Sequence, residues 1–367
     1  MPGTGRAGTA PWASDIRPIL EDSYRHLPEG RFIAELITSS LAVNTYDSYG
    51  TGWRRFVAYM QRRGRHPLRG NEQDVADYLV ALAREGTVKL KSCQPYLSAI
   101  NRAYADAGLP RIALGPLVQS VRAGLSNRQF NLDPDESRRA LPAEIALAWF
   151  DRAILIDFEA SDETARNRDL VLARNLLASL LLYVTGSRPS SIRRLEIEAI
   201  SILTCGSVQL IRNYVKGQND SDDHDVVGRR PIKLPYAQLA AQLKAFDAAR
   251  RAARPTAHFF FELSANDHAV AASARWFTGA LDAVRVAPAD RVNLSPGSGR
   301  SGFASGANAV GVVLPKIKYI GGWALNSTTV EKHYIDPTYP DTPAARYFFE
   351  YLVTGQRPAA RVNMGQG

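Results

Sequence analysis

The sequence predicts a mainly α-helical protein of two domains, the second of which carries one small antiparallel sheet. The chain has 367 residues, and a single hydrophobic core usually stops growing at about 250–300 residues, so two domains are expected. Apolar residues recur at helical spacing through most of the chain, and only one short region shows strand-like runs. No part alternates strands with helices as a parallel sheet requires.

The composition favours an intracellular protein with an anionic partner. The 45 Lys and Arg residues exceed the 36 Asp and Glu residues and give a formal net charge of +9. This excess suits a polyanion, although a solvated basic surface explains it equally well. Cys93 and Cys205 lie in separate segments without metal-ligand spacing, which indicates neither a disulfide framework nor a zinc site. We expect no membrane span and no secretory signal, because no run approaches about 18 apolar residues and the first residues lack an apolar core.

Changes in composition predict five successive segments. Gly, Pro and Ala dominate the opening residues, the segment NRQFNLDPDESRR is polar, and the chain ends in QRPAARVNMGQG. We therefore expect a disordered segment, a helical domain, a linker, a second domain and a flexible tail, at residues 1–30, 31–126, 127–140, 141–355 and 356–367.

The first domain is predicted to be a bundle of four short helices. Its first helix carries the apolar stripe Tyr46, Tyr49, Trp53, Phe56, Val57 and Met60. Asn71 is expected to cap the second helix, the third follows Gly86, and the fourth spans about 117–125. Basic residues lie between the apolar ones and make candidate phosphate contacts to DNA, the alternative being an ordinary solvated surface: Arg54, Arg55, Arg62, Arg63, Arg65, Lys89, Lys91 and Arg102.

The second domain is predicted to surround one buried helix. A first helical turn is expected at Pro142, and the buried helix spans about 162–185, where Leu, Val and Ala are so dense that nearly every side faces apolar surroundings. AISILT and SVQLIRNYVKG then form a hairpin that turns at Cys205 and Gly206, and RRPIKL adds a third strand. The remaining helices are expected at about 235–253, at 265–285 and from residue 300 onward.

An arginine follows the end of the buried helix. In YVTGSRPSSIRRLEI, Arg188 comes just after Gly186, and Pro189 begins a new helix. A guanidinium held in this way can bind a phosphate through two parallel hydrogen bonds. A structural salt bridge is the alternative for Arg188.

Four segments in order resemble the tyrosine recombinases and phage-type integrases. TGSRPSSIRRL is similar to the first arginine box of that family, and Lys216 in NYVKGQ lies where the family keeps a hairpin lysine. LSPGSGRSGFASGANAVGVVLPKIKYIGGW resembles the second box, in which Arg300 matches the arginine and Trp323 the His/Trp position. STTVEKHYIDP supplies Tyr334 at the position of the nucleophile.

The resemblance covers about residues 40–349 and implies both fold and activity. It implies a SAM-like helical core-binding bundle followed by an α-rich catalytic domain of the DNA breaking-rejoining enzyme fold. The amino-acid sequence of the last segments most resembles recombinases of eukaryotic mobile elements of the DIRS and Crypton types. Double-stranded DNA would be the partner, four protomers would act together, and no metal or other cofactor is required. The location would be the nucleus in a eukaryotic host and the cytoplasm otherwise.

The resemblance also assigns a role to each matched residue. The Tyr334 hydroxyl would attack a phosphodiester and form a 3′-phosphotyrosyl link. Arg188 and Arg300 would stabilise the charge that develops on the phosphoryl oxygens. Lys216 would protonate the leaving 5′-oxygen, and the Trp323 indole would donate its N–H to a phosphoryl oxygen.

The glycines of the second box and the spacing of Tyr334 depart from the family pattern, and the docking of the last helix stays open. Gly297 stands where the second box has a histidine, and Gly299 stands where a larger apolar residue is usual. Tyr334 follows Trp323 by eleven residues rather than nine, which leaves Tyr339 as an alternative nucleophile. The sequence therefore predicts an active or slowed recombinase, or a DNA-binding protein that no longer cuts. The helix PAARYFFEYLV is expected to dock on a neighbouring protomer or on its own domain.

Overall fold

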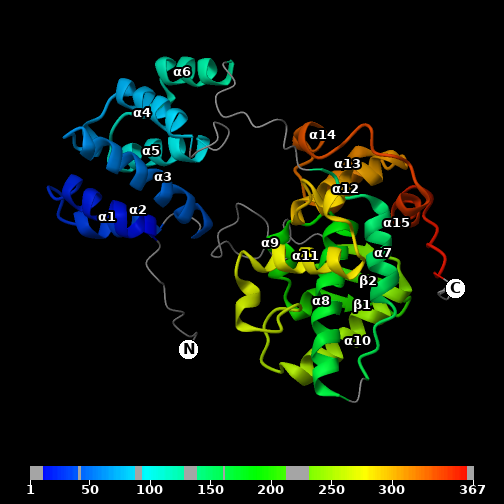
Figure 1. Cartoon of the computed structure of the whole chain (residues 1–367). Helices are drawn as coiled ribbons and strands as arrows, with labels where there is room; N and C mark the ends of the chain where they lie inside the picture. The colour runs from blue at the N-terminus through cyan, green and yellow to red at the C-terminus, as the bar shows by residue number, and fades with distance from the viewer. Residues whose placement is uncertain are drawn as a thin grey trace. The chain divides into compact units, whose positions relative to one another are not determined.

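The computed structural model describes residues 11–39, 43–86, 93–127, 139–159, 162–211 and 231–361. The chain divides into two compact units, Met1–Asp135 and Glu136–Gly367, called here the N-terminal and C-terminal units, and each has its own hydrophobic core. Figure 1 shows helices in both units and one small sheet in the C-terminal unit. In the described parts of the chain, no helix combines the length and the apolar character that crossing a membrane requires.

The N-terminal unit is a helical bundle around aromatic side chains. Trp53, Phe56 and Tyr78 are buried, and the Phe56 ring packs edge-on against Tyr78. The predicted cap Asn71 is confirmed, because its side chain accepts a hydrogen bond from the amide of Asp74. The α-helices described in this unit are α1 (Pro11–Ser23), α2 (Gly30–Ser39), α3 (Val43–Arg62), α4 (Glu72–Glu85), α5 (Gln94–Asp106) and α6 (Pro116–Asn127).

Helix α1 corrects the expectation of disorder over residues 1–30. Residues 11–23 are helical, and Ile16 and Leu20 are fully buried in the core of the N-terminal unit. Their spacing of four residues places both on one helix face. The Gly- and Pro-rich composition of the chain's first residues hid this amphipathic segment, and the bundle has two helices before the four that were predicted.

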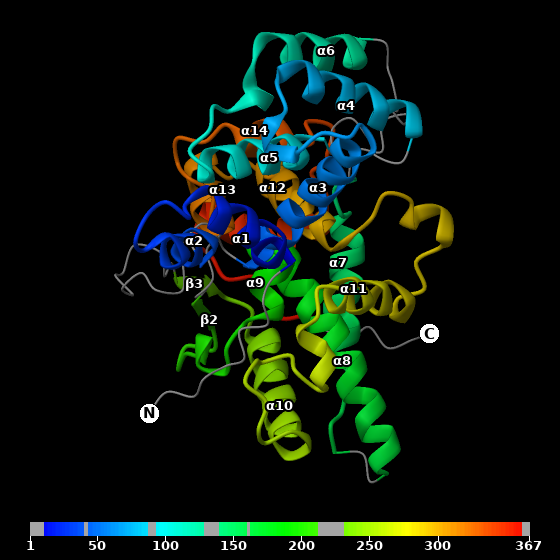
Figure 2. The ribbon, with the colours of Figure 1, turned by 90° about the vertical axis from the view of Figure 1, so that its left-hand side faces the viewer.

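The C-terminal unit is built around helix α8 (Glu163–Thr185), which confirms the predicted buried helix. Leu176, Leu177, Leu180 and Leu181 have no exposed surface. The helices α7 (Ala143–Ala153), α10 (Ala237–Ala253), α11 (Ala272–Ala283) and α12 (Pro296–Ala309) contact α8 (Figures 1 and 2). The other described α-helices are α9 (Pro189–Arg193), α13 (Leu314–Gly321), α14 (Thr329–His333) and α15 (Pro343–Thr354).

Helix α11 begins later than the predicted residue 265. Residues 265–268 form a separate 3₁₀ turn, because the Asp267 carboxylate accepts hydrogen bonds from the amides of Leu263 and Ser264. Asp267 also forms a buried ion pair with Arg174 at 2.8 Å. The carboxylate therefore fixes a turn where the apolar pattern alone suggested a continuous helix.

The predicted three-stranded antiparallel sheet is present. Its strands β1 (Ile200–Ile202), β2 (Val208–Ile211) and β3 (Pro231–Leu234) lie in the order β1-β2-β3, and Leu210 pairs with both Ile200 and Ile232. Gly206, at a φ of +72°, lies in the turn between the first two strands. Lys216 falls outside the described residues, so its predicted place in the hairpin stays a prediction.

The C-terminal helix α15 packs on its own unit. Phe348 and Phe349 lie in the same core as α8, and the Tyr236 hydroxyl donates a hydrogen bond to the Phe348 carbonyl. The predicted flexible tail is wrong for residues 356–361. Arg361 donates two hydrogen bonds to the Asp151 carboxylate, at 2.9 and 2.6 Å, and this bidentate pair fixes the segment.

Candidate active site

A glycine turn at the end of α8 positions Arg188. Gly186 has a φ of +57°, and a Cβ atom there would lie 2.3 Å from Cδ1 of Phe303, so only glycine fits this turn. The chain then enters α9 with Arg188 as its N-cap residue. The Arg188 side chain is half-buried, and it forms no hydrogen bond or ion pair with any residue that the structure describes. The structural salt bridge considered for Arg188 is therefore not formed within those residues.

Arg300 connects the turn after α8 with the end of α13. Its side chain is 3% exposed. The Nη1 atom donates hydrogen bonds to the carbonyl oxygens of Gly186 and Gly321, the second at 2.6 Å. Because Gly186 lies two residues before Arg188, Arg300 joins the two arginine boxes through the backbone.

Trp323 and Tyr334 lie against the same guanidinium. The Cζ atom of Arg300 lies 3.6 Å from the centre of the Trp323 ring and 5.3 Å from the centre of the Tyr334 ring. The two rings meet edge to face, with centroids 5.1 Å apart. These contacts bring Arg300, Trp323 and Tyr334 into one cluster, and a cation held over aromatic faces is stabilised by their quadrupoles.

Ser305 fixes the backbone on both sides of the tyrosine. Its buried hydroxyl donates a hydrogen bond to the Tyr334 carbonyl at 3.0 Å and accepts one from the Asp336 amide at 2.8 Å. The Tyr334 side chain itself is only partly buried. The segment that carries it is thus held by its own C-terminal unit while the phenol keeps access to solvent.

An ion pair holds α14, the short helix before Tyr334. Lys318 on α13 is 6% exposed, and its Nζ lies 2.8 Å from Oε1 of Glu331. The hydrogen bond from Lys318 lowers the pKa of Glu331. Nothing in the sequence marked Ser305 or this ion pair, because each acts through a backbone or side chain brought close only by the crossing of α12, α13 and α14.

The geometry favours Tyr334 over Tyr339. The Tyr339 hydroxyl donates a hydrogen bond to the Leu141 carbonyl at 2.7 Å and lies 3.4 Å from the Tyr183 hydroxyl. Burial raises the pKa of Tyr339, which opposes ionisation of its phenol. Tyr339 therefore acts as a packing residue, whereas Tyr334 adjoins Arg300.

The glycines of the second box lie at the start of α12. This helix begins at Pro296 rather than at the predicted residue 300, because the Ser298 hydroxyl accepts a hydrogen bond from the amide of the N-cap residue Ser295 at 3.0 Å. Gly297 lies in the first turn, so this helix presents no imidazole there. A Cβ atom on Gly299 would lie 3.0 Å from Cβ of Leu182 on α8, which explains why a larger residue is absent at this position.

Three of the predicted DNA contacts form ion pairs of 3.1 Å or less with acids of the N-terminal unit, and a fourth, Arg62, pairs with Glu85 at 4.0 Å. Arg63 lies 3.1 Å from Asp77, and Arg102 lies 2.7 Å from Asp106. Arg65 pairs with the buried carboxylate of Asp74, which is also part of the cap of α4. These contacts give the three arginines structural roles. Lys89 and Lys91 fall outside the described residues.

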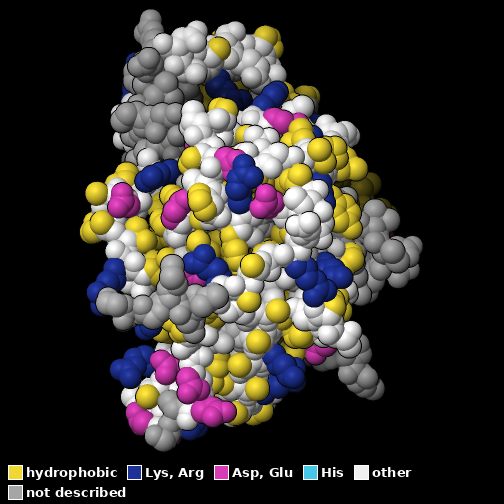
Figure 3. Space-filling model, turned by 90° about the vertical axis from the view of Figure 1, so that its right-hand side faces the viewer, with side chains coloured by type: hydrophobic (Ala, Val, Ile, Leu, Met, Phe, Trp, Pro, Cys, Tyr) yellow, Lys and Arg dark blue, Asp and Glu magenta, His cyan; other side chains and the backbone are white. Residues whose placement is uncertain are grey.

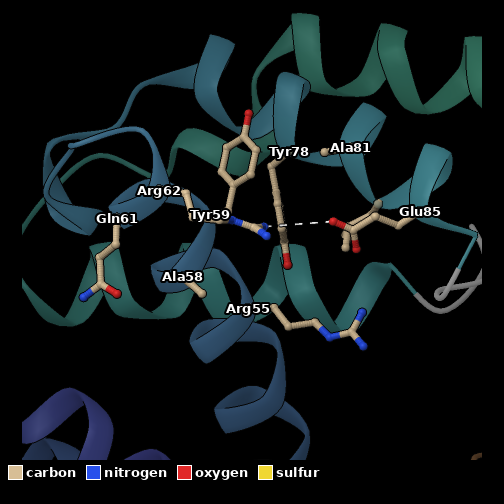
Figure 4. Close-up of a pocket in the computed structure, with 9 residues that line it drawn as sticks. Arg55, Ala58, Tyr59, Gln61, Arg62, Tyr78, Ala81 and Glu85 are labelled. Carbon is tan, nitrogen blue, oxygen red and sulfur yellow. Dashed lines mark ion pairs between the residues drawn. The ribbon is translucent and has the colours of Figure 1, made fainter.

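The other three predicted contacts, Arg54, Arg55 and Arg62, are exposed on α3. A pocket of about 600 Å³ lies between α3 and α4 and is lined by Arg55, Arg62 and Tyr78. In Figure 4 the side chains of Arg55, Arg62 and Glu85 surround Tyr78, and the dashed line marks the Arg62–Glu85 ion pair. The Tyr78 hydroxyl is buried without a hydrogen-bond partner in the described structure, and burial raises the pKa of Tyr78.

Charge is mixed on the face of the molecule drawn in Figure 3. Basic side chains there form small separate groups, and acidic side chains lie next to several of them. The excess of positive charge is therefore not gathered on this face. Among the described residues, no group of three or more His, Cys, Asp and Glu side chains is placed to bind a metal ion.

Known proteins match this chain in one domain family and in fold. Residues 30–107 match the phage integrase N-terminal SAM-like domain. No curated protein sequence matches the chain. One similar solved structure is the XerH site-specific recombinase bound to difH in a pre-cleavage complex. The match covers 88% of this chain and 93% of the XerH chain, at 13% identity and a TM-score of 0.56. The Tn1549 transposon integrase in complex with transposon right end DNA covers 90% and 98% at 16% identity, with a TM-score of 0.53.

These similarities confirm the predicted fold class. The first unit contains a SAM-like domain, the described residues are mainly helical with one three-stranded antiparallel sheet, and the fold matches the two recombinase structures. At identities of 13% and 16%, these structural matches show the fold alone. The chemistry has to be argued from the residues themselves.

Proposed function

We propose that this chain is a site-specific DNA recombinase or integrase that cuts and rejoins DNA through a 3′-phosphotyrosyl intermediate on Tyr334. The observation that carries the proposal is the cluster in which Arg300 contacts Trp323, Tyr334 and the carbonyl of Gly186. Three residues far apart in the sequence converge there, beside the turn that holds Arg188. The SAM-like domain and the fold support the same activity.

The cluster suits attack on a phosphodiester. The phenol oxygen of Tyr334 forms a bond to phosphorus as the bond to the 5′-oxygen breaks, and the leaving oxygen takes a proton to become a free hydroxyl. Arg188 and Arg300 offset the negative charge of the transition state. Lys216 supplies the proton, and Trp323 orients a phosphoryl oxygen. The reverse attack by a 5′-hydroxyl rejoins the strand, since the phosphotyrosyl link retains the energy of the broken bond.

The wider setting is part of the proposal. Double-stranded DNA is the partner, and strand exchange between two duplexes requires four cleavages, which implies four protomers. The similarity of the last sequence segments to DIRS-type and Crypton-type recombinases favours a mobile element, and a nuclear location in a eukaryotic host. The exposed arginines of α3 supply phosphate contacts for the N-terminal unit.

Gly297 supports a second candidate function. Without the imidazole of the second box, the chain would bind DNA through its arginines and no longer cut. General acid–base assistance contributes about 100- to 10,000-fold to a rate, so its loss leaves either a slow enzyme or an inactive one. The retention of Arg188, Arg300, Trp323 and Tyr334 favours the slow enzyme.

A nicked suicide substrate distinguishes the two functions. Cleavage next to the nick releases a short fragment with the 5′-hydroxyl, so the covalent adduct accumulates and migrates slowly on a denaturing gel. We expect a slow-forming adduct with the wild type, none with Tyr334→Phe, and an adduct with the matched control Tyr339→Phe. DNA binding without any wild-type adduct would establish the binding function instead.

Replacement of the missing group tests the cause of the slow rate. Gly297→His should raise the rate of adduct formation by about 100-fold, the lower end of the range for general acid–base assistance. An unchanged rate, with the variant folded and bound to DNA, would show that another group already supplies the proton transfer.

A further inference from the structure

A cavity of about 630 Å³ adjoins Tyr334 in the C-terminal unit. Four segments of the chain line it: Arg139 and Ala140 before α7, Asn293 before α12, Ser301 on α12, and the residues from Lys332 to Asp336. Ser301 directly follows Arg300 in the chain, so the cavity lies next to the cluster described above. The cavity shares Tyr334 with that cluster but contains other side chains.

The side chains that line this cavity suit an anion. Arg139 and Lys332 are basic, His333 adds an imidazole, and none of the three forms an ion pair with a described residue. The one acid of the lining, Asp336, already accepts hydrogen bonds from the amide and the hydroxyl of Thr338, at 2.9 and 2.7 Å. The two fixed positive charges of Arg139 and Lys332 exceed the single negative charge of Asp336, so an anion entering the cavity would meet net positive charge.

Ser301 adds a hydrogen-bond donor to the wall of the cavity. Its side chain is 5% exposed, and it forms no hydrogen bond with the residues that the structure describes. Its hydroxyl is thus open to a hydrogen-bond partner that enters the cavity. A phosphate oxygen in the cavity would supply that partner while Arg139 and Lys332 offset its charge.

We infer that this cavity binds a backbone phosphate of the DNA strand that Tyr334 attacks, next to the phosphate that is cleaved. This inference rests on the proposed function. A strand carries one phosphate for about every 3.4 Å of helix axis, so a phosphate held at Tyr334 and Arg300 brings its neighbours within reach of adjoining sites. The cavity would thus fix the register of the strand against the nucleophile.

The salt dependence of DNA binding tests this subsite. Each phosphate neutralised by the protein adds about 0.9 to the slope of log Kobs against log salt concentration on a duplex. The double variant Arg139→Gln, Lys332→Gln should lower that slope by about one. The matched control Arg168→Gln, Lys244→Gln removes the same charge from α8 and α10, at the end of the unit far from α14 (Figures 1 and 2). It should leave the slope unchanged.

Two outcomes would overturn the subsite. An unchanged slope in the first double variant means that no phosphate is bound there, and an equal fall in both double variants means that only the net charge matters. Thermal unfolding of each variant establishes that it is folded. Adduct formation by the wild type on the suicide substrate is measured separately. A failure of the subsite and a failure of the recombinase function therefore give different results.

A second measurement separates backbone phosphate from free phosphate. Inorganic phosphate is titrated at constant ionic strength, and the C2–H resonance of His333, assigned with His333→Gln, is followed by NMR. A shift of this resonance together with the changed salt slope supports a site for DNA phosphate. A shift with an unchanged slope would mean that the cavity takes a free phosphate, and would reject the strand-binding role.

Discussion

The guanidinium carbon of Arg300 lies 3.6 Å from the centre of the Trp323 ring, while Nη1 of the same side chain bonds the carbonyls of Gly186 and Gly321. Arg300 is thus a structural connector as well as a candidate catalytic residue. The Arg188 side chain, by contrast, forms no hydrogen bond or ion pair within the described structure. The two arginines should therefore respond differently to mutation.

Arg300→Ala should reduce both stability and activity. It leaves two carbonyls without their donor, and an unsatisfied buried group costs about 1–3 kcal/mol, so we expect the free energy of unfolding to fall by about 2–5 kcal/mol. Arg188→Ala should change it by less than about 0.5 kcal/mol. Both should slow adduct formation by at least about 100-fold, as the loss of a preorganised charge does. Urea denaturation and the suicide substrate measure the two effects, and equal stability losses would show that Arg188 also holds the fold.

Gly186→Ala tests the turn that presents Arg188. Gly186 and Gly311 both have positive φ, +57° and +87°, but a Cβ atom meets the Phe303 ring only at Gly186 and open space at Gly311. The left-handed conformation alone costs about 1–2 kcal/mol with a side chain. Gly186→Ala should therefore destabilise more than Gly311→Ala in urea denaturation. Equal losses would mean that Phe303 moves aside.

The sequence predicted correctly those helices and caps that neighbouring residues in the chain determine. Asn71 was predicted as a cap and accepts the expected hydrogen bond, and the dense Leu and Ala residues of α8 predicted a helix buried on nearly all sides. The boundaries at 265 and 300 were wrong because side chains that bond the backbone decide them: Asp267 accepts from the amides of Leu263 and Ser264, and Ser298 accepts from the amide of Ser295. Helix α1 was missed because a Gly- and Pro-rich composition surrounds two buried apolar residues.

The candidate site was predictable only as a list of residues. Order and spacing identified Arg188, Arg300, Trp323 and Tyr334, but not the backbone carbonyl of Gly186 that links them. The choice between Tyr334 and Tyr339 needed the fold, which commits the Tyr339 hydroxyl to the Leu141 carbonyl. Such contacts depend on which helices pack against each other, and the pattern of a single sequence does not show which helices pack together.

The basic residues of the N-terminal unit should divide into two groups. Arg65→Gln leaves the buried Asp74 carboxylate without its cationic partner, so we expect a loss of about 1–3 kcal/mol in unfolding free energy and a small effect on DNA binding. Arg54→Gln should lower the salt slope of DNA binding by about 0.9, because Arg54 is exposed on α3. Urea denaturation and binding titrations at several salt concentrations measure both. A changed slope for Arg65→Gln would return that residue to the DNA interface.

The Lys318–Glu331 pair should make the order of α14 depend on pH. The pKa of Glu331 is lowered below its ordinary 4.5 by the hydrogen bond from Lys318, so the pair stabilises the folded state above that value and is lost as the pH falls below it. At neutral pH, Glu331→Gln should speed amide exchange in residues 325–336, and wild type and variant should converge in acid. Glu350→Gln, which removes a surface pair with Arg346, is the control. No difference at neutral pH would show that the pair does not hold the helix.

Ser305→Ala should separate positioning of the nucleophile from DNA binding. The Ser305 hydroxyl holds the Tyr334 carbonyl and the Asp336 amide, and misplacement of a reacting group by about 1 Å can cost about 100-fold in rate. We expect the single-turnover rate of adduct formation to fall about 10- to 100-fold, with the dissociation constant for DNA unchanged. Ser179→Ala is the matched control, because Ser179 is an equally buried serine whose hydroxyl has no hydrogen-bond partner among the described residues. A fall in DNA affinity that accounts for the slower rate, or an equal effect of Ser179→Ala, would mean that Ser305 supports packing and does not position Tyr334.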